Sequence, residues 1–223
     1  MVKKKALLDT FLPRVDRERI EACVRQVEGT TSGEIVPMVV PSSHPYPLAS
    51  LSGALGAGLL LAVLATAYVS LRRAWGGLTL VELWVFPAVF GLFTPLFYEL
   101  MRLVPALRRL FIRGQEMAEE VEEAALSAFY RRGLSHTRDH TGILIFISVF
   151  ERRVQVLADS GINAKVPPEA WQEVADLIVA GIRRGRQGEA ICQAVKRCGE
   201  LLGEHFPRRR DDRDELQNLI VEE

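Results

Sequence analysis

The sequence has few of the features that point to familiar chemistry. Its three cysteines, Cys23, Cys192 and Cys198, are odd in number and lack CxxC or zinc-ligand spacing, so neither a disulfide framework nor a zinc site is indicated. We expect them to be small buried side chains in a reducing compartment. No glycine loop of the kind that cradles phosphates is present. The 28 Lys and Arg balance 28 Asp and Glu, so the chain lacks the net positive field that would hold a nucleic acid, and none is expected as a partner.

Charged side chains are missing altogether from one long stretch, Leu51–Leu71. As a helix, this stretch and its neighbours can cross a hydrocarbon core of about 30 Å, because each residue adds about 1.5 Å. A second apolar run, Leu78–Met101, carries Glu82 and Glu99 near its ends and aromatic residues at its boundaries. The sequence therefore predicts a two-helix transmembrane hairpin over residues 47–103. The alternative is a buried pair of soluble helices, but such helices show a polar face every 3.6 residues, which the first run lacks.

Small residues recur four positions apart along the first span and form a Gly/Ala face. The pairs are Ser52 with Gly56, Gly53 with Ala57, and Ala54 with Gly58. Such a face lets another helix approach closely, so we expect that the span can form a homo-oligomer through it. No ionisable residue lies at mid-depth of either run, so the usual sign of a transport role is absent.

Two spans place the soluble pieces before and after the hairpin on the same side of the membrane. Arginines are more numerous after the second span than in the short loop: Arg102, Arg108, Arg109 and Arg113 against Arg72 and Arg73. The N-terminus shows no secretory signal pattern. We therefore expect a multi-pass protein of the inner membrane, with the lipid bilayer as a partner and the soluble domain facing the cytoplasm.

The soluble pieces show mixed helical and strand patterns. Asp16 is expected to cap a helix that runs to about Glu28, and a strand is expected over Glu34–Val40. A long amphipathic helix is predicted over Leu107–Arg132, ending at Gly133. Its buried side is expected to comprise Leu110, Val121, Ala125, Ala128 and Phe129.

The most strand-like part of the chain follows this helix. Gly142–Val149 is apolar almost throughout, as a central strand covered on both faces would be, and Arg152–Ala158 alternates as a partly exposed neighbour does. "VFER" between them is expected to turn an antiparallel hairpin. Two helices follow, in "PPEAWQEVADLIVAGIRRG" and "GEAICQAVKRCGELLGEHF".

This order predicts an α/β fold in which a mixed sheet has helices on both faces and the transmembrane hairpin interrupts the domain. The expected parts are an N-terminal part of the domain (1–46), the hairpin (47–103), the rest of the domain (104–207) and a charged C-terminal tail (208–223).

In "SGEIVPMVV", "TGILIFIS" and "VLADSGI" the chain resembles the TPM domain family, formerly a domain of unknown function, and looks like its membrane-inserted bacterial branch. The resemblance implies a TPM-like α/β sandwich with acidic residues near strand ends. For some members it implies divalent metal binding and weak phosphatase activity, and for others the maintenance of membrane complexes. The positions that match are Asp139 before the central strand, Asp159 after its partner and Glu34 at the start of the first strand. They would be the ligands of a calcium or magnesium ion.

Other roles stay open for these residues. Asp139 and Asp159 also suit turns or caps, because Asp bonds nearby backbone amides. "SHTRDHTG" brings Ser135, His136 and His140 close together, which suggests a hydrolytic triad or zinc site, but proximity within one loop favours a polar surface loop.

Two functions from different classes follow from these expectations. The first is a membrane-anchored TPM-like domain that acts as an accessory, binding or maintenance factor for an unidentified membrane protein or complex, with no catalysis required. The alternative is a divalent-metal-dependent, phosphatase-like hydrolase in which Asp139 and Asp159 hold the metal and bound water is the nucleophile.

Overall fold

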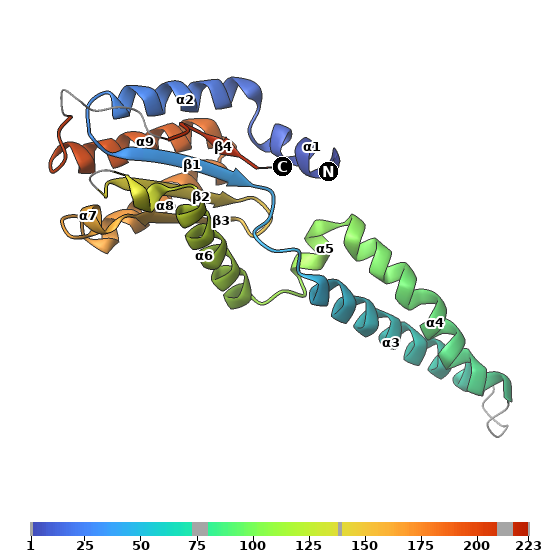
Figure 1. The fold of residues 1–223 in the computed structure, drawn as a ribbon. Helices are drawn as coiled ribbons and strands as arrows, with labels where there is room; N and C mark the ends of the chain where they lie inside the picture. The colour runs from blue at the N-terminus through green and yellow to red at the C-terminus, as the bar shows by residue number, and fades with distance from the viewer. Residues whose placement is uncertain (1, 73–79, 138–139, 209–215, 223) are drawn as a thin grey trace. The chain divides into compact units, whose positions relative to one another are not determined.

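Two units make up the chain in the computed structural model, which describes residues 2–72, 80–137, 140–208 and 216–222. The first is an α/β unit, Met1–His44 with Ala118–Glu223, and the second is a hairpin unit, Pro45–Met117. Both are coloured along the chain in Figure 1.

A four-stranded mixed sheet in the order β3-β2-β1-β4 forms the centre of the α/β unit (Figure 1). β1 (Glu34–Val40) pairs in parallel with β2 (Gly142–Ser148), and β2 pairs antiparallel with β3 (Arg153–Ala158). β4 (Ile220–Val221) adds in parallel to the other side of β1. The expected bounds of β1 are confirmed, and so is the antiparallel hairpin, although β2 ends one residue and β3 begins one residue inside the predicted ranges. β4 was not predicted.

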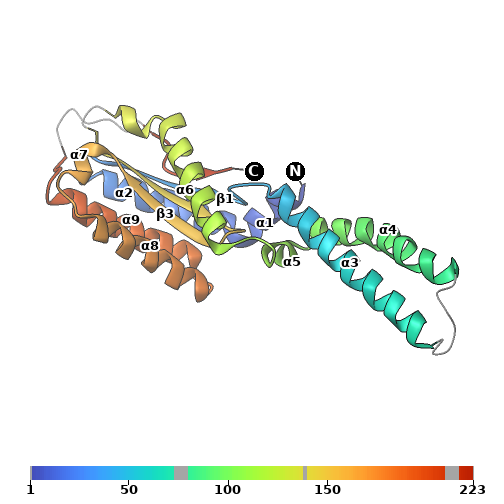
Figure 2. The ribbon, with the colours of Figure 1, turned by 90° about the horizontal axis from the view of Figure 1, so that it is seen from below.

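Two hydrophobic cores lie on opposite faces of this sheet, because successive side chains of a strand point to opposite sides. Ile35 and Ile145 belong to one core, and Val36 and Leu144 to the other. The first core includes side chains of α2 (Arg14–Glu28), α8 (Pro168–Arg183) and α9 (Gln187–Gly203). The second core packs under α6 (Gly114–Arg131), which crosses the other face of the sheet in Figure 2. The predicted mixed sheet with helices on both faces is confirmed.

Three shorter helices complete the described part of the α/β unit. They are α1 (Val2–Phe11), a 3-10 turn η1 (Leu134–His136) and α7 (Ser160–Asn163). Leu8 of α1 and the following Leu12 are buried in the first core.

Two helix predictions are wrong. Asp16 does not cap α2; the helix begins at Arg14 after Pro13, and Asp16 lies in its first turn, where a carboxylate favours the positive end of the helix dipole. The single helix predicted over Leu107–Arg132 is two helices, α5 (Pro105–Arg109) and α6. Leu110, expected on the buried side, is 78% exposed. The other four residues of that side are buried as predicted.

The hairpin unit consists of α3 (Pro47–Arg72), α4 (Leu80–Leu103) and α5. α3 and α4 pack along each other, and Pro47–Arg72 and Leu83–Leu103 are long and apolar enough to cross a membrane. Glycines allow their close approach: a Cβ at Gly58 would collide with Thr94 Oγ1, and one at Gly53 with Met101. Part of the predicted Gly/Ala face is therefore used within the hairpin. Ser52 and Gly56 remain exposed, and homo-oligomerisation stays a prediction.

Candidate functional site

Two of the predicted metal positions, Glu34 and Asp159, lie at the edge of the sheet where β1 and β2 begin. Glu34 is paired with Gly142 in the parallel register, and Asp159 N donates a hydrogen bond to Gly142 O at 2.9 Å from the other side. The backbones of Glu34 and Asp159 therefore flank the first residue of β2. Because neighbouring strands lie about 4.8 Å apart, these two backbones are about 10 Å apart.

Asp159 acts as the N-cap of α7. Its Oδ1 accepts hydrogen bonds from Ser160 N at 2.6 Å and from Ser160 Oγ at 3.2 Å. Its other oxygen, Oδ2, lies 3.2 Å from His140 Nδ1. Asp159 is 8% exposed, whereas the His140 ring is largely open to solvent. The capping role that the sequence allowed for Asp159 is thus present, and one carboxylate oxygen faces a histidine.

Hydrogen bonds of Thr137 and Thr141 connect the described residues before β2 to the start of β1. Thr141 N donates to Thr137 Oγ1 at 3.0 Å, Thr141 Oγ1 donates to Ser32 O at 3.0 Å, and Glu34 N donates to Thr141 O at 3.1 Å. A Cβ on Gly142 would meet Leu134 O, so this position requires glycine. Thr141 is therefore hydrogen-bonded both to Thr137 and to the residues at the start of β1.

The described residues do not by themselves form a metal-ligand set. Calcium takes six to eight oxygen ligands, and the described part of the edge offers the carboxylates of Glu34 and Asp159 on strands separated by β2. No group of three or more His, Cys, Asp or Glu that could hold a metal occurs among the residues described in this structure. Asp139 lies outside the described residues, and the proposed site of Asp139, Asp159 and Glu34 stays a prediction.

The contact between His140 and Asp159 was not anticipated from the sequence, which favoured a polar surface loop for His140. A signal for it existed. In an antiparallel hairpin the residues just before the first strand and just after the second are neighbours, so the segment before β2 had to meet the segment after β3. His140 has a positive φ of 54°.

A second polar cluster surrounds Glu151, in the turn between β2 and β3. The residue is 1% exposed. Its Oε1 accepts hydrogen bonds from Ser42 Oγ and Ser43 N, both at 3.1 Å, and its Oε2 accepts one from Ser148 Oγ. Glu151 therefore fixes the residues that leave β1 to the turn of the hairpin. The sequence placed this glutamate in the turn but gave no sign that it is buried.

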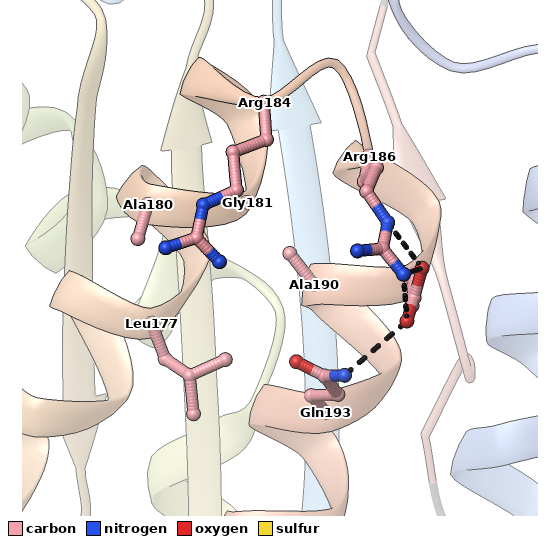
Figure 3. A pocket seen from close by; sticks show the side chains of 8 residues that line it. Leu177, Ala180, Gly181, Arg184, Arg186, Ala190 and Gln193 are labelled. Atoms are coloured by element: carbon pink, nitrogen blue, oxygen red, sulfur yellow. Dashed lines mark hydrogen bonds and ion pairs between the residues drawn. The ribbon is translucent and has the colours of Figure 1, made fainter.

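A shallow hollow of about 200 Å³ lies between α8 and α9 (Figure 3). Arg186 donates two hydrogen bonds of 2.8 Å to Glu189, and Gln193 donates one of 3.4 Å to the same carboxylate. The charge of Arg186 is thus offset by Glu189. Arg184 also lines the hollow, and Glu189 is the one carboxylate among the residues that line it.

The cysteines are free and buried, as predicted. Burial is the main cause that raises the pKa of both Cys192 and Cys198 from 9.0 to about 12. Both side chains are therefore protonated thiols at neutral pH, and they pack as small hydrophobic groups rather than acting as thiolate nucleophiles.

Comparisons with known proteins agree with this architecture. The chain is similar in structure to the BA42 protein from the psychrophilic bacterium Bizionia argentinensis, solved by NMR, with a TM-score of 0.55 over 95% of this chain and 96% of that one. Their sequence identity is 17%, so this likeness concerns the fold alone. No curated protein matched the sequence.

The sequence model of the TPM domain matches residues 106–201. The matched range contains α6, β2, β3, α7 and α8 together with most of α9, and therefore both Asp139 and Asp159. Glu34 and helices α3 and α4 lie outside it. Over residues 106–201 the chain is therefore similar to the TPM domain family.

Proposed function

We propose that the chain is a membrane-anchored accessory protein. In this proposal hairpin α3–α4 holds the TPM-containing α/β unit at the inner membrane, on the cytoplasmic side, where the unit binds a membrane protein or complex and helps to maintain it. Catalysis is not part of this function.

The observation that carries the proposal is the apolar outer surface of the hairpin. Only 33% of the apolar window of α3 and 0% of that of α4 is buried. A buried pair of soluble helices would cover these side chains. The largest exposed ones include Leu60, Leu64 and Tyr68 on α3 and Trp84, Leu92 and Leu96 on α4.

This surface is costly to keep in water. Burying a leucine-sized side chain is worth about 1.5–3 kcal/mol, so six exposed side chains represent on the order of 10 kcal/mol. A hydrocarbon environment removes this cost without any partner protein. The length of α3, 26 residues or about 39 Å, also suits a core of about 30 Å.

The use of the acidic side chains supports a binding domain over an enzyme. Asp159 caps α7, and the buried Glu151 holds the hairpin turn. Both carboxylates thus have roles in stabilising the fold.

The proposal is tested by capturing the tagged full chain from membranes in mild detergent after in-cell photo-crosslinking. We expect one membrane protein or complex to be recovered above an untagged control. Recovery of nothing above that control would contradict the accessory function.

The alternative, a metal-assisted phosphate-ester hydrolase, is favoured by one feature: Glu34 and Asp159 flank the start of β2, with His140 beside Asp159. The full chain would then release phosphate from an ester when calcium, magnesium or manganese is added. An unchanged rate in the Asp139→Asn, Asp159→Asn double variant would eliminate this alternative.

A further inference from the structure

The segment Arg102–Arg113, at the base of the hairpin unit, combines exposed apolar side chains with positive charge; we call it the interfacial segment. It contains four arginines, Arg102, Arg108, Arg109 and Arg113, and no acidic residue. Leu103, Val104, Leu110 and Phe111 are large apolar side chains exposed on its surface. An exposed apolar surface mixed with arginines is typical of helices that lie in the membrane interface.

The segment is held against the start of α3. Arg108 Nη1 donates a hydrogen bond to Pro45 O at 3.3 Å, and Phe111 lies so close to Gly53 that a Cβ there would touch its ring. α5 contacts both α3 and α4, as Figure 2 shows. The interfacial segment therefore lies beside the first residues of α3.

A hydrocarbon core centred on α3 would end close to Gly53 and Phe111. α3 is about 39 Å long, so a centred core of about 30 Å leaves about 4–5 Å of helix outside at each end. Gly53 lies six residues after Pro47, or about 9 Å along the helix. Phe111 beside it is thus a few ångströms inside the core boundary, within the 5–10 Å depth that interfacial apolar faces reach.

We propose that the interfacial segment lies in the bilayer interface and that its arginines bind the phosphate groups of anionic phospholipids. This inference rests on the proposed membrane anchoring. Leu110 and Phe111 enter the acyl region, and the arginines extend outward to the headgroups. A guanidinium pairs with phosphate through two parallel hydrogen bonds, which favours Arg over Lys in this role.

The charges of the segment are not equally available. Arg102 forms an ion pair with Glu99 at 2.8 Å, and Arg108 is tied to Pro45. Arg113 is exposed. We therefore assign most of the lipid recognition to Arg113.

The test uses the full chain in nanodiscs with an environment-sensitive fluorophore on Leu110→Cys. The three native cysteines are buried, so the introduced thiol is labelled selectively in the folded protein. Phospholipids with brominated acyl chains quench a fluorophore that reaches the acyl region. Brominated phosphatidylglycerol and brominated phosphatidylcholine are compared in otherwise identical discs.

We expect quenching at Leu110→Cys, and stronger quenching by phosphatidylglycerol. A basic residue near an anionic surface changes binding by about fivefold, so the Arg113→Gln variant should lower the preference about fivefold. High salt should lower it as well. The control, Arg183→Gln, removes one exposed arginine at the end of α8 and should leave the preference unchanged.

A probe on Leu60→Cys, in the middle of α3, distinguishes failure of the membrane anchoring from failure of the interfacial assignment. Quenching at Leu60 but not at Leu110 would overturn the interfacial assignment and leave the anchor intact. Equal quenching by both lipids at Leu110 would overturn the recognition of anionic lipids. Absence of quenching at Leu60 would overturn the membrane anchoring, and the inference with it.

Discussion

Replacement of Glu151 by Ala is expected to destabilise the α/β unit strongly. The carboxylate is buried and accepts hydrogen bonds from Ser42, Ser43 and Ser148. A hydrogen bond to a charged group contributes about 1.5–3 kcal/mol, so three give about 4.5–9 kcal/mol as a simple sum. They share one side chain, and water can enter the space that Ala leaves, so we expect a loss of about 4 kcal/mol.

A change of 1 kcal/mol shifts the melting temperature of a protein of this size by about 2–4 °C. Glu151→Ala should therefore melt about 8–16 °C below the native chain. Glu151→Gln keeps one acceptor oxygen and should fall about halfway between the two. A fluorogenic maleimide follows unfolding in detergent, because all three cysteines are buried in the α/β unit and react only when it opens.

The neighbouring Arg152 provides a matched control. It is exposed and has a φ of 55°, a conformation that glycine adopts freely. Relief of this strain roughly offsets the greater flexibility of glycine in the unfolded chain, so Arg152→Gly should melt within about 2 °C of the native chain. If Glu151→Ala also melted within about 2 °C, the structural role assigned to the buried carboxylate would be wrong.

Four further predictions concern the candidate site and the core. Gly142→Ala should lower the melting temperature by several degrees, because its Cβ would press against the backbone of Leu134; an unchanged value would show that η1 can move away freely. Asp159→Asn should retain the cap of α7, whereas Asp159→Ala should lose about 1 kcal/mol, and equal stability of the two would argue against the cap. Burial raises the pKa of Cys192 and Cys198 to about 12, so iodoacetamide at pH 8 should modify neither residue in the folded chain. Both should be modified in denaturant, as measured by the mass of the intact protein. Rapid labelling of the native chain would contradict their burial. The same shift has a stability consequence: stabilisation from the neutral thiols is complete below about pH 9 and is lost as pH rises toward 12, so Cys198→Ala should be less sensitive to alkali than the native chain.

The two central strands of the sheet were predictable because each is a continuous run of apolar residues. β1 and β2 are buried at every position, and a run without polar interruption indicates such strands directly. β4 has two residues, too few for any periodicity, and its place beside β1 depends on pairing across the whole chain. Strand order depends on the same distant contacts, so local sequence does not determine it.

The break between α5 and α6 shows where an apolar pattern misleads. Leu107 and Leu110 continue the spacing of Val121 and Ala125, which suggested one helix. The apolar residues before the break belong to the hairpin unit, and those after it pack on the sheet. A periodic pattern of apolar residues predicts a buried helix face, but it does not show which unit that face packs against.

The strand-end positions of Glu34 and Asp159 were predictable from the sequence, and their contacts were not. The resemblance to the TPM domain family placed acidic residues at strand ends, and Glu34 and Asp159 do flank the start of β2. The partners of Asp159, a backbone amide and His140, depend on how the two ends of a hairpin meet. The burial of Glu151 likewise arises from the chain leaving β1, more than a hundred residues earlier in the sequence.

Nitroxide accessibility along α3 tests whether α3 and α4 lie in lipid. Spin labels at Leu51, Leu60 and Leu71 in reconstituted bilayers would be compared with one at Leu126, an exposed leucine of α6 in the α/β unit. Oxygen partitions into lipid and a charged nickel chelate stays in water. If α3 lies in lipid, the label at Leu60 has the highest collision rate with oxygen and almost none with nickel. A nickel collision rate at Leu60 equal to that at Leu126 would contradict it.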